Sequence, residues 1–412
     1  MKLILYMWGS NSDNILKKNL IRMGHKVTVY DQKCEHYTRD LKFAQGLINL
    51  IHECGADAVV TNDYFPIISM ISNTVGILYY SWVYDSPHYT LFASTSKYPC
   101  NRIGCFDRAL VERLNSIGIN TVKHLPLGVD WSYSRRESTT NSGKYKCDVS
   151  FVGSLYTGVH NYYDNLNDEK IRAKADELIK SQCFEYEKDY LRVFFKDEEE
   201  SYKDCNKDFK IIEKNSRTNS SGEITDKVRN ILIEEKLLPG DEYIEYIEYI
   251  FTSHFLEKKV TVEERHILLN EVAQKGYDFA VYTGSDLTME PDLKKANRGI
   301  VDYHREMPYV FRNSKINLNI TLRSIHTGIH LRALDIMGCG GFLLSNYQEE
   351  LKEYFREDEE LVMFYGLDDC LDKIAYYLDH EDERKRIAAA GRRTVEEKFK
   401  YKDQLFKLLN MS

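Results

Sequence analysis

The stretch around residue 330 constrains the fold of this chain most. Every second side chain is apolar in residues 316–320, a period typical of a half-buried strand. A polar loop follows over residues 321–329, and leucine and methionine then recur at helical spacing over residues 331–337. A Gly-Cys-Gly-Gly run ends that helix, and residues 342–345 form a second apolar strand. We therefore predict a strand–loop–helix–strand unit of the kind from which parallel sheets are built.

The loop and the first helical turn of this unit are a candidate site for a diphosphate next to a ribose. Ligands of open parallel sheets bind where such loops leave the carboxyl ends of strands, and a helix amino terminus attracts phosphate. Arg332 would add a forked donor for phosphate oxygens. Asp335, on the same helix face, could accept hydrogen bonds from the ribose. Any βαβ unit has this outline, however, and a solvated Arg–Asp salt bridge is the alternative interpretation.

Strands and helices alternate along most of the chain, which predicts the α/β class with a parallel, doubly wound sheet. A length of 412 residues suggests about two domains. We predict a first domain over residues 1–131, a polar linker over 132–146 and a second domain over 147–395. A charged, tyrosine-rich segment, 155–275, breaks the alternation and is predicted to be a helical insertion. The other predicted strands are 3–7, 27–30, 58–61, 77–83, 103–106, 122–127, 148–152, 279–282, 300–303 and 362–364.

The charge and the apolar segments exclude several classes of partner. The formal net charge of −8 argues against a surface for nucleic acid or anionic membranes. The amino-terminal apolar run is too short for a secretory signal, and no stretch approaches the roughly 20 apolar residues of a membrane span. With nine scattered cysteines and no export signal, we expect a reduced, cytoplasmic protein without an integral membrane segment.

The sequence LRALDIMGCGGFLLSNYQEEL resembles the donor-binding segment of GT-B glycosyltransferases, in which a helix with an acidic residue precedes a Cys-Gly turn. It resembles the bacterial spore-maturation-protein (CgeB-type) glycosyltransferase family more closely, because Arg332, Asp335 and the Gly-Gly-Phe-Leu-Leu run follow that family's pattern. Asp335 stands where glutamate is common in GT-B enzymes. Further family signatures occur in family order along nearly the whole chain: DYFPIIS, WVYDSP, FDRAL, HLPLGVD, DVSFVGSLY, VYTGSD and VDYHREMPYVFRNSKINLNITLRS.

This resemblance implies two Rossmann-like domains that face a cleft, with the acceptor on the first domain and a nucleotide sugar on the second. It implies a nucleotide-diphosphate sugar, expected to be UDP-linked, as co-substrate, and a protein or cell-surface glycan as acceptor. No other cofactor is expected. The last helix of GT-B proteins often crosses back to the first domain, and residues 396–412 could do the same.

Metal-dependent GT-A enzymes use an Asp-x-Asp element, and none occurs in this sequence. We therefore predict a metal-independent site in which basic side chains and backbone N–H groups hold the departing diphosphate. Arg323 and His326, on the loop before the predicted helix, are candidates, although surface polarity explains them almost equally well. The remaining donor candidates are Thr327 and Gly328 on the same loop, and Gly153, Ser154, Thr283 and Gly284 directly after two predicted strands.

Asp85 and His88 are the candidates for the catalytic base. Asp85 follows the most apolar predicted strand, at what should be its carboxyl end, and Pro87 stiffens the turn. His88 lies nearby, and histidine is the commonest general base. A capping role for Asp85 is as well supported, and an enzyme that retains anomeric configuration needs no such base.

Two other functions stay open from the sequence. A nucleotide-sugar 2-epimerase has the same fold, and product analysis without an acceptor would separate it from a transferase. A non-catalytic spore or surface-layer protein could keep a nucleotide-binding shell, although Arg332 and Asp335 count against it. The sequence does not indicate the sugar, the stereochemistry or the oligomeric state.

Overall fold

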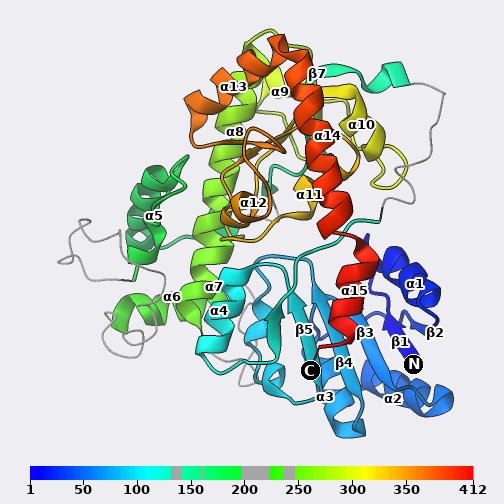
Figure 1. Cartoon of the computed structure of the whole chain (residues 1–412). Helices are drawn as coiled ribbons and strands as arrows, with labels where there is room; N and C mark the ends of the chain where they lie inside the picture. The colour runs from blue at the N-terminus through cyan, green and yellow to red at the C-terminus, as the bar shows by residue number, and fades with distance from the viewer. Residues whose placement is uncertain (131–141, 159–161, 196–221, 235–245, 412) are drawn as a thin grey trace.

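The computed structural model of the chain describes residues 1–130, 142–158, 162–195, 222–234 and 246–411. Two parallel sheets flanked by helices form two domains, which lie one above the other in Figure 1. The predicted α/β class with two Rossmann-like domains is therefore confirmed. The segment predicted as a linker, 132–146, lies mostly outside the described residues, as do parts of the predicted insertion.

The first domain is built on a six-stranded parallel sheet with the order β2-β1-β3-β4-β5-β6. Strand β3 lies inside this sheet and is buried at all five positions, the polar Thr61 and Asn62 included. The strands are β1 (Lys2–Tyr6), β2 (Lys26–Tyr30), β3 (Ala58–Asn62), β4 (Leu78–Val83), β5 (Asn101–Cys105) and β6 (Val122–His124). The connecting helices are α1 (Asp13–Arg22), α2 (Leu41–Cys54), α3 (Pro66–Val75) and α4 (Arg108–Ser116).

Local sequence fixes both ends of α2. The Asp40 carboxylate accepts a hydrogen bond from the backbone N–H of Phe43 at 2.9 Å and so caps the first turn. Gly55 ends the helix with a φ of 58°, a left-handed conformation that other residues adopt only with strain. The helix thereby presents its buried face, which includes Phe43, Leu47 and Ile51, to the sheet at a defined register.

The second domain has a five-stranded parallel sheet with the order β11-β10-β9-β7-β8. Its strands are β7 (Cys147–Val152), β8 (Phe279–Tyr282), β9 (Ser314–Asn319), β10 (Leu343–Asn346) and β11 (Val362–Phe364). Its helices are α9 (Pro291–Ala296), α10 (Met307–Asn313), α11 (Leu331–Gly338), α12 (Glu349–Tyr354), α13 (Leu367–Asp379) and α14 (Glu381–Lys398).

The strand predicted over residues 300–303 is wrong, because these residues form a loop. The chain touches the sheet only through an isolated bridge between Val281 on the edge strand β8 and Asn297. Gly299, with a φ of 87°, then turns the chain away before it can pair further. Ile300 is consequently 79% exposed.

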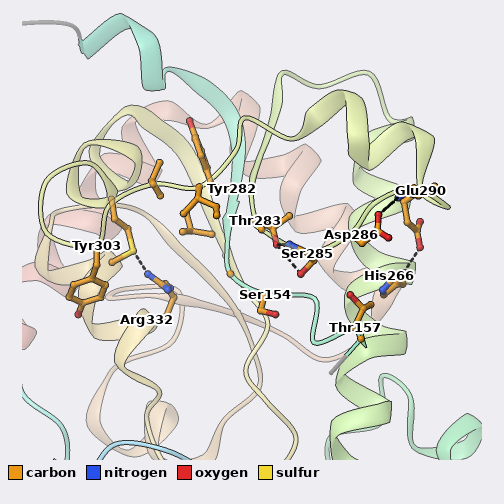
Figure 2. A pocket seen from close by; sticks show the side chains of 18 of the residues that line it. Ser154, Thr157, His266, Tyr282, Thr283, Ser285, Asp286, Glu290, Tyr303 and Arg332 are labelled. Carbon is orange, nitrogen blue, oxygen red and sulfur yellow. Dashed lines mark hydrogen bonds and ion pairs between the residues drawn. The ribbon is translucent and has the colours of Figure 1, made fainter. Parts of the chain in front are cut away.

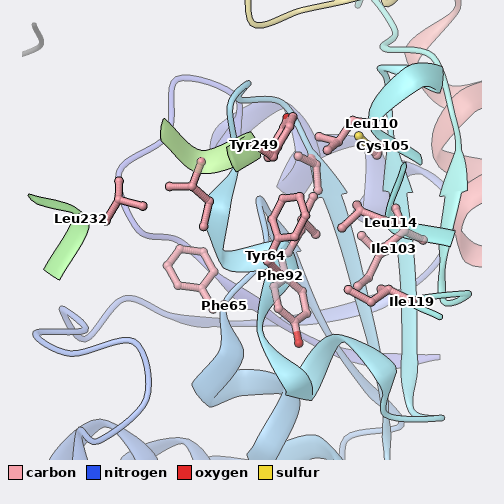
Figure 3. Close-up of a cluster of buried hydrophobic side chains, with 14 of the residues drawn as sticks. Tyr64, Phe65, Phe92, Ile103, Cys105, Leu110, Leu114, Ile119, Leu232 and Tyr249 are labelled. Atoms are coloured by element: carbon pink, nitrogen blue, oxygen red, sulfur yellow. The ribbon is translucent and has the colours of Figure 1, made fainter. Parts of the chain in front are cut away.

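The segment between β7 and β8 is helical where it is described, and it packs on the first domain. Its helices are α5 (Glu169–Gln182), α6 (Gly222–Glu234), α7 (Ile247–Phe251) and α8 (Glu257–Gln274), with a π turn, Thr252–Leu256, between the last two. Leu232 and Tyr249 from this segment share one buried cluster with Phe92 and Leu110 of the first domain (Figure 3). A segment inserted into one domain in sequence therefore completes the core of the other.

The last helix, α15 (Tyr401–Leu409), lies against the sheet of the first domain (Figure 1). The Tyr80 hydroxyl donates to the Leu409 carbonyl at 3.2 Å, and Arg102 Nε donates to the Met411 carbonyl at 3.1 Å. The backbone of Val129 also pairs with that of Phe399 and Tyr401 just before this helix. The carboxyl terminus thus ties the two domains together.

Candidate functional site

A cavity of about 790 Å³ lies at the carboxyl edge of the second sheet (Figure 2). Its wall brings together the residues that leave β7, the residues that leave β8 and the first turn of α11. Asn11, on the loop after β1, lines it from the first domain. Five of the residues predicted for donor binding meet here, namely Gly153, Ser154, Thr283, Gly284 and Arg332.

Backbone hydrogen bonds fix the two strand-end turns against each other. The Gly153 N–H donates to the Tyr282 carbonyl at 3.1 Å, and the Leu155 N–H donates to the Ser285 hydroxyl at 2.9 Å. A Cβ at Gly284 would lie 3.0 Å from Cδ1 of the exposed Ile300 side chain, a tight contact that the glycine avoids. The turns can therefore offer backbone groups to a ligand at close range.

Arg332 stands in the first turn of α11, with its guanidinium against the Met307 sulfur (Figure 2). Within the described part of the chain, this guanidinium forms no ion pair. His330 caps the helix by accepting the Arg332 N–H at 3.3 Å. Burial, together with the charges of Arg332 and Arg265, lowers the pKa of His330 to about 3, so the imidazole is neutral and can accept. The partial positive charge of the α11 amino terminus and the Arg332 guanidinium, which has no ion pair among the described residues, therefore lie together.

Arg265 on α8 is a site residue that was not predicted, because no local motif marks it. It is 5% exposed and donates to the backbone carbonyls of Ser154 and Ile320. Its guanidinium also lies 4.8 Å from the centre of the Tyr156 ring. Arg265 therefore holds the turn after β7 to the end of β9, and it adds a second positive charge behind Arg332.

An ion pair occupies the other end of the cavity. His266 Nδ1 contacts the Glu290 carboxylate, and Asn270 donates to the same carboxylate. Figure 2 shows this pair opposite Arg332 and Tyr303, with Ser154 and Thr283 between them. His266 Nε2 has no hydrogen-bond partner among the described residues. The cavity accordingly has a cationic end and an end that can bond polar groups of a ligand.

Asp335 does not line the cavity but lies behind Tyr303, which does. The Tyr303 hydroxyl donates to the Asp335 carboxylate, with oxygen–oxygen distances of 2.9 and 3.2 Å. Burial raises the pKa of Asp335 to about 6, against the opposing influence of Arg332 and Tyr303. In this arrangement Asp335 reaches a ligand only through Tyr303.

The raised pKa of Asp335 predicts a pH-dependent effect of Asp335→Asn on stability. The folded chain holds this proton up to about pH 6, whereas the unfolded chain releases it near the ordinary value, so the stabilising contribution is complete at low pH and lost as pH rises through about 6. The shift corresponds to on the order of 3 kcal/mol. Melting curves should therefore show Asp335→Asn to be more stable than the wild type at pH 8, with a gap that shrinks at pH 5. The same substitution at exposed Asp372 serves as control, and a gap independent of pH would contradict the prediction.

Arg323 and His326 face the insertion and not the cavity. Arg323 forms a bidentate ion pair with buried Glu264, and its guanidinium stacks 3.9 Å from the centre of the Tyr186 ring. His326 Nε2 lies 2.7 Å from Glu257. Burial alone would lower the pKa of His326, but the Glu257 carboxylate raises it to about 9. Donor binding by Arg323 and His326 stays a prediction, to which this geometry lends no support.

Thr327 and Gly328 join the two domains. The Asp107 carboxylate of the first domain accepts the backbone N–H of Thr327 at 3.1 Å, and the Ala109 N–H donates to the Thr327 hydroxyl at 3.1 Å. A Cβ at Gly328 would lie 2.8 Å from the Phe106 carbonyl, so this glycine permits the close approach. The structure therefore assigns these two loop residues to domain contact and does not bring them to the cavity.

Asp85 and His88 lie on the loop after β4, and this loop also meets the second domain. The Ser86 hydroxyl donates to the Ser324 carbonyl at 2.7 Å. Asp85 is exposed, and its backbone N–H donates to Asp63 at 3.2 Å. His88 Nε2 instead lies 3.1 Å from the Tyr64 N–H, and burial lowers the pKa of His88. Asp85 is therefore the better placed of the two to meet an acceptor.

Among the described residues, no cluster of three or more His, Cys, Asp or Glu side chains could hold a metal ion. No helix in the described ranges combines the length and apolar character needed to cross a membrane.

Comparisons with known proteins agree with this architecture. Residues 264–410 match the family model described as glycosyl transferase-like. No curated protein sequence matches the chain significantly. Solved structures share its fold at low identity, and the matches span nearly the whole of both chains. A glycosyltransferase from Rickettsia africae has 10% identity and a TM-score of 0.54, with coverage of 100% of this chain and 99% of the other.

Two further structures extend the comparison. Anabaena HepE in complex with UDP-glucose has 8% identity and a TM-score of 0.55, with coverage of 99% and 98%. Sucrose-phosphate synthase from Thermosynechococcus elongatus has 8% identity and a TM-score of 0.53, with coverage of 99% and 97%. The chain therefore has the GT-B glycosyltransferase fold, with a glycosyl transferase-like second domain.

Proposed function

We propose that this chain is a glycosyltransferase that moves a sugar from UDP to an acceptor hydroxyl without a metal ion. The observation that carries the proposal is the convergence of two strand-end turns and Arg332 on one cavity at the carboxyl edge of the second sheet. A guanidinium without an ion pair, at a helix amino terminus, suits a diphosphate. UDP is favoured because Anabaena HepE, which has the same fold, was solved with UDP-glucose.

The transfer requires stabilisation of the departing diphosphate, a positioned acceptor and a base. The acceptor oxygen attacks the anomeric carbon, the bond from that carbon to the β-phosphate oxygen breaks, and its electron pair leaves with UDP. Arg332 and the start of α11 would stabilise the charge that develops on the diphosphate. Asp85 would take the proton of the acceptor hydroxyl. Gly153, Ser154, Thr283 and Gly284 would shape the donor cavity, and Asp335 would orient Tyr303.

The finer parts of the proposal rest on the sequence. Membership of the spore-maturation (CgeB-type) group and a protein or cell-surface glycan as acceptor come from the order of the motifs, and action in the cytoplasm comes from the nine scattered cysteines.

Nucleotide release from a panel of nucleotide sugars tests the proposal. The full chain is incubated with UDP-, GDP-, ADP- and dTDP-sugars, with and without candidate acceptors, and the released nucleotide diphosphate and sugar products are measured. We expect release from a UDP-sugar above the background of Arg332→Ala. Conversion of the donor sugar to its 2-epimer without an acceptor would identify an epimerase instead, and failure of every nucleotide to bind would reject the proposal.

Chelation tests the metal-independent site. With Arg332 in place of a cation, we expect donor hydrolysis or transfer to persist in excess EDTA at essentially the untreated rate. Rates are compared before chelation, after chelation, and after addition of manganese or magnesium. Complete loss that manganese restores would mean that a metal stabilises the leaving group.

A further inference from the structure

Two exposed aromatic side chains, Trp8 and Tyr37, stand near the carboxyl edge of the first sheet. Each is 40% exposed, and both contact the ring of Phe65, with centroid distances of 6.1 and 5.6 Å. Trp8 lies on the loop after β1, and Tyr37 lies between β2 and α2. Scattered exposed aromatic residues are common, but two that share a buried neighbour beside a ligand cavity form a surface suited to binding.

Trp8 is held in place before any ligand arrives. Its indole N–H donates to the Asn62 carbonyl at 2.9 Å. The Asp13 carboxylate fixes the following turn by accepting the N–H groups of Gly9 and Ser10, each at 3.0 Å. A ring that is already ordered loses little conformational entropy when a ligand stacks on it.

The same loops connect this aromatic surface to the transfer site. Asn11, three residues after Trp8, lines the donor cavity. Tyr37 packs on Phe65, two residues after Asp63, and the Asp63 carboxylate accepts the Asp85 N–H at 3.2 Å. Burial raises the pKa of Tyr37, and the charges of Asp63 and Asp85 raise it further. A molecule on Trp8 and Tyr37 would therefore adjoin the exposed Asp85 and the loop that borders the donor.

His254 packs against the loop that carries Asp85. This histidine of the π turn is 5% exposed, and neither ring nitrogen has a hydrogen-bond partner among the described residues. Its ring lies 5.7 Å, between centroids, from Tyr89, on the loop that carries Asp85. Burial lowers the pKa of His254 well below its ordinary value, so the ring is neutral, with one donor and one acceptor. Both ring nitrogens are also shielded from solvent, so His254 supports the Asp85 loop by packing and is not a ligand contact in this structure.

We propose that the acceptor is a saccharide, whose ring stacks on Trp8 and Tyr37 and presents one hydroxyl to Asp85. A pyranose ring offers a face of C–H bonds to the electron-rich face of an aromatic ring, and its hydroxyls match a carboxylate. The inference rests on the proposed function, because it assigns the acceptor of that transfer. The acceptor oxygen bonds to the donor's anomeric carbon, its proton passes to Asp85, and UDP leaves with the electron pair.

Saturation-transfer NMR on the full chain tests the inference. The probes are the methyl glycosides of glucose, galactose, mannose, rhamnose, N-acetylglucosamine and N-acetylgalactosamine, each added to the UDP-saturated protein. We expect at least one to receive saturation, most strongly at the C–H protons of one ring face. The signal should fall about tenfold or more in Trp8→Ala, in line with the ~1.5 kcal/mol upper range for aromatic contacts beyond burial, and be partly kept in Trp8→Phe. Phe406→Ala, at a 59% exposed aromatic residue on α15, is the matched control and should keep the full signal.

The acceptor surface and the donor site can be disproved separately. If UDP binds but no glycoside receives saturation, the saccharide acceptor is overturned while the donor site stands. A glycoside signal unchanged in Trp8→Ala would overturn the stacking surface. Absence of UDP binding in calorimetry of the wild type would overturn the proposed function and this inference with it.

Discussion

Asp85→Asn is expected to lower the transfer rate about 10²–10⁴-fold, the usual contribution of a general base. The asparagine keeps the size and much of the hydrogen bonding of the aspartate but cannot accept a proton. Asp85 is exposed at the end of β4, and its loop touches the second domain through Ser86 and Ser324. Its carboxylate therefore lies on the side where donor and acceptor would meet. Because the loop is fixed by backbone bonds to Asp63, the substitution should leave its conformation intact.

Three measurements separate catalysis from structure in this variant. UDP affinity and melting temperature should stay near those of the wild type, while the transfer rate falls. Asp372→Asn, at an exposed aspartate on α13, is the matched control and should keep full activity. A large fall in melting temperature would indicate a capping role. Unaffected transfer would direct the search to His88 or to a retaining mechanism.

The strand–loop–helix–strand unit of residues 316–345 was predictable because its signals are local. Alternation in β9, the three-residue spacing of Leu331, Leu334 and Met337 in α11, and the glycines that follow depend only on neighbours in sequence. Likewise, residues directly after parallel strands converge at one edge of a sheet, which is why Gly153 and Thr283 meet. Once the strands are assigned, the topology alone predicts that these two residues lie close together.

The partners of charged side chains were not predictable in the same way. Arg323 and His326 follow a strand and are as polar as any phosphate ligand, but their carboxylate partners, Glu264 and Glu257, come from α8. That pairing depends on how the insertion packs, and the sequence carries no local sign of it. Arg265 lies on the same helix but was not predicted as a site residue, because only the fold brings it to the turn after β7.

The packing of the insertion also lay beyond sequence reasoning. Helical periodicity identifies an apolar face but not the surface that will cover it. In the structure, Leu232 and Tyr249 join the core of the first domain, so the insertion and α15 both connect the domains (Figures 1 and 3). The relative position of the Asp85 loop and the donor cavity therefore depends on contacts from both ends of the second domain.

Arg332→Ala is expected to weaken UDP binding about ten- to more than a hundredfold, because a hydrogen bond to a charged group contributes roughly 1.5–3 kcal/mol. The effect should be large because Arg332 forms no ion pair in the described residues, so its charge is available to the diphosphate. Arg332→Lys should recover only part of the affinity, since lysine keeps the charge but loses the planar fork.

Calorimetry with UDP and with uridine distinguishes the source of this loss. If Arg332 contacts the diphosphate, the substitution should reduce UDP affinity and leave uridine affinity nearly unchanged, because uridine carries no phosphate. Arg312→Ala is the matched control, since Arg312 on α10 donates to the Cys339 carbonyl and does not line the cavity. Equal weakening of both ligands would place Arg332 at the nucleoside or in the packing of α11 against Met307. Unchanged UDP affinity in a folded Arg332→Ala protein would remove this arginine from the donor site, and the buried guanidinium of Arg265 would then be the next side chain to test.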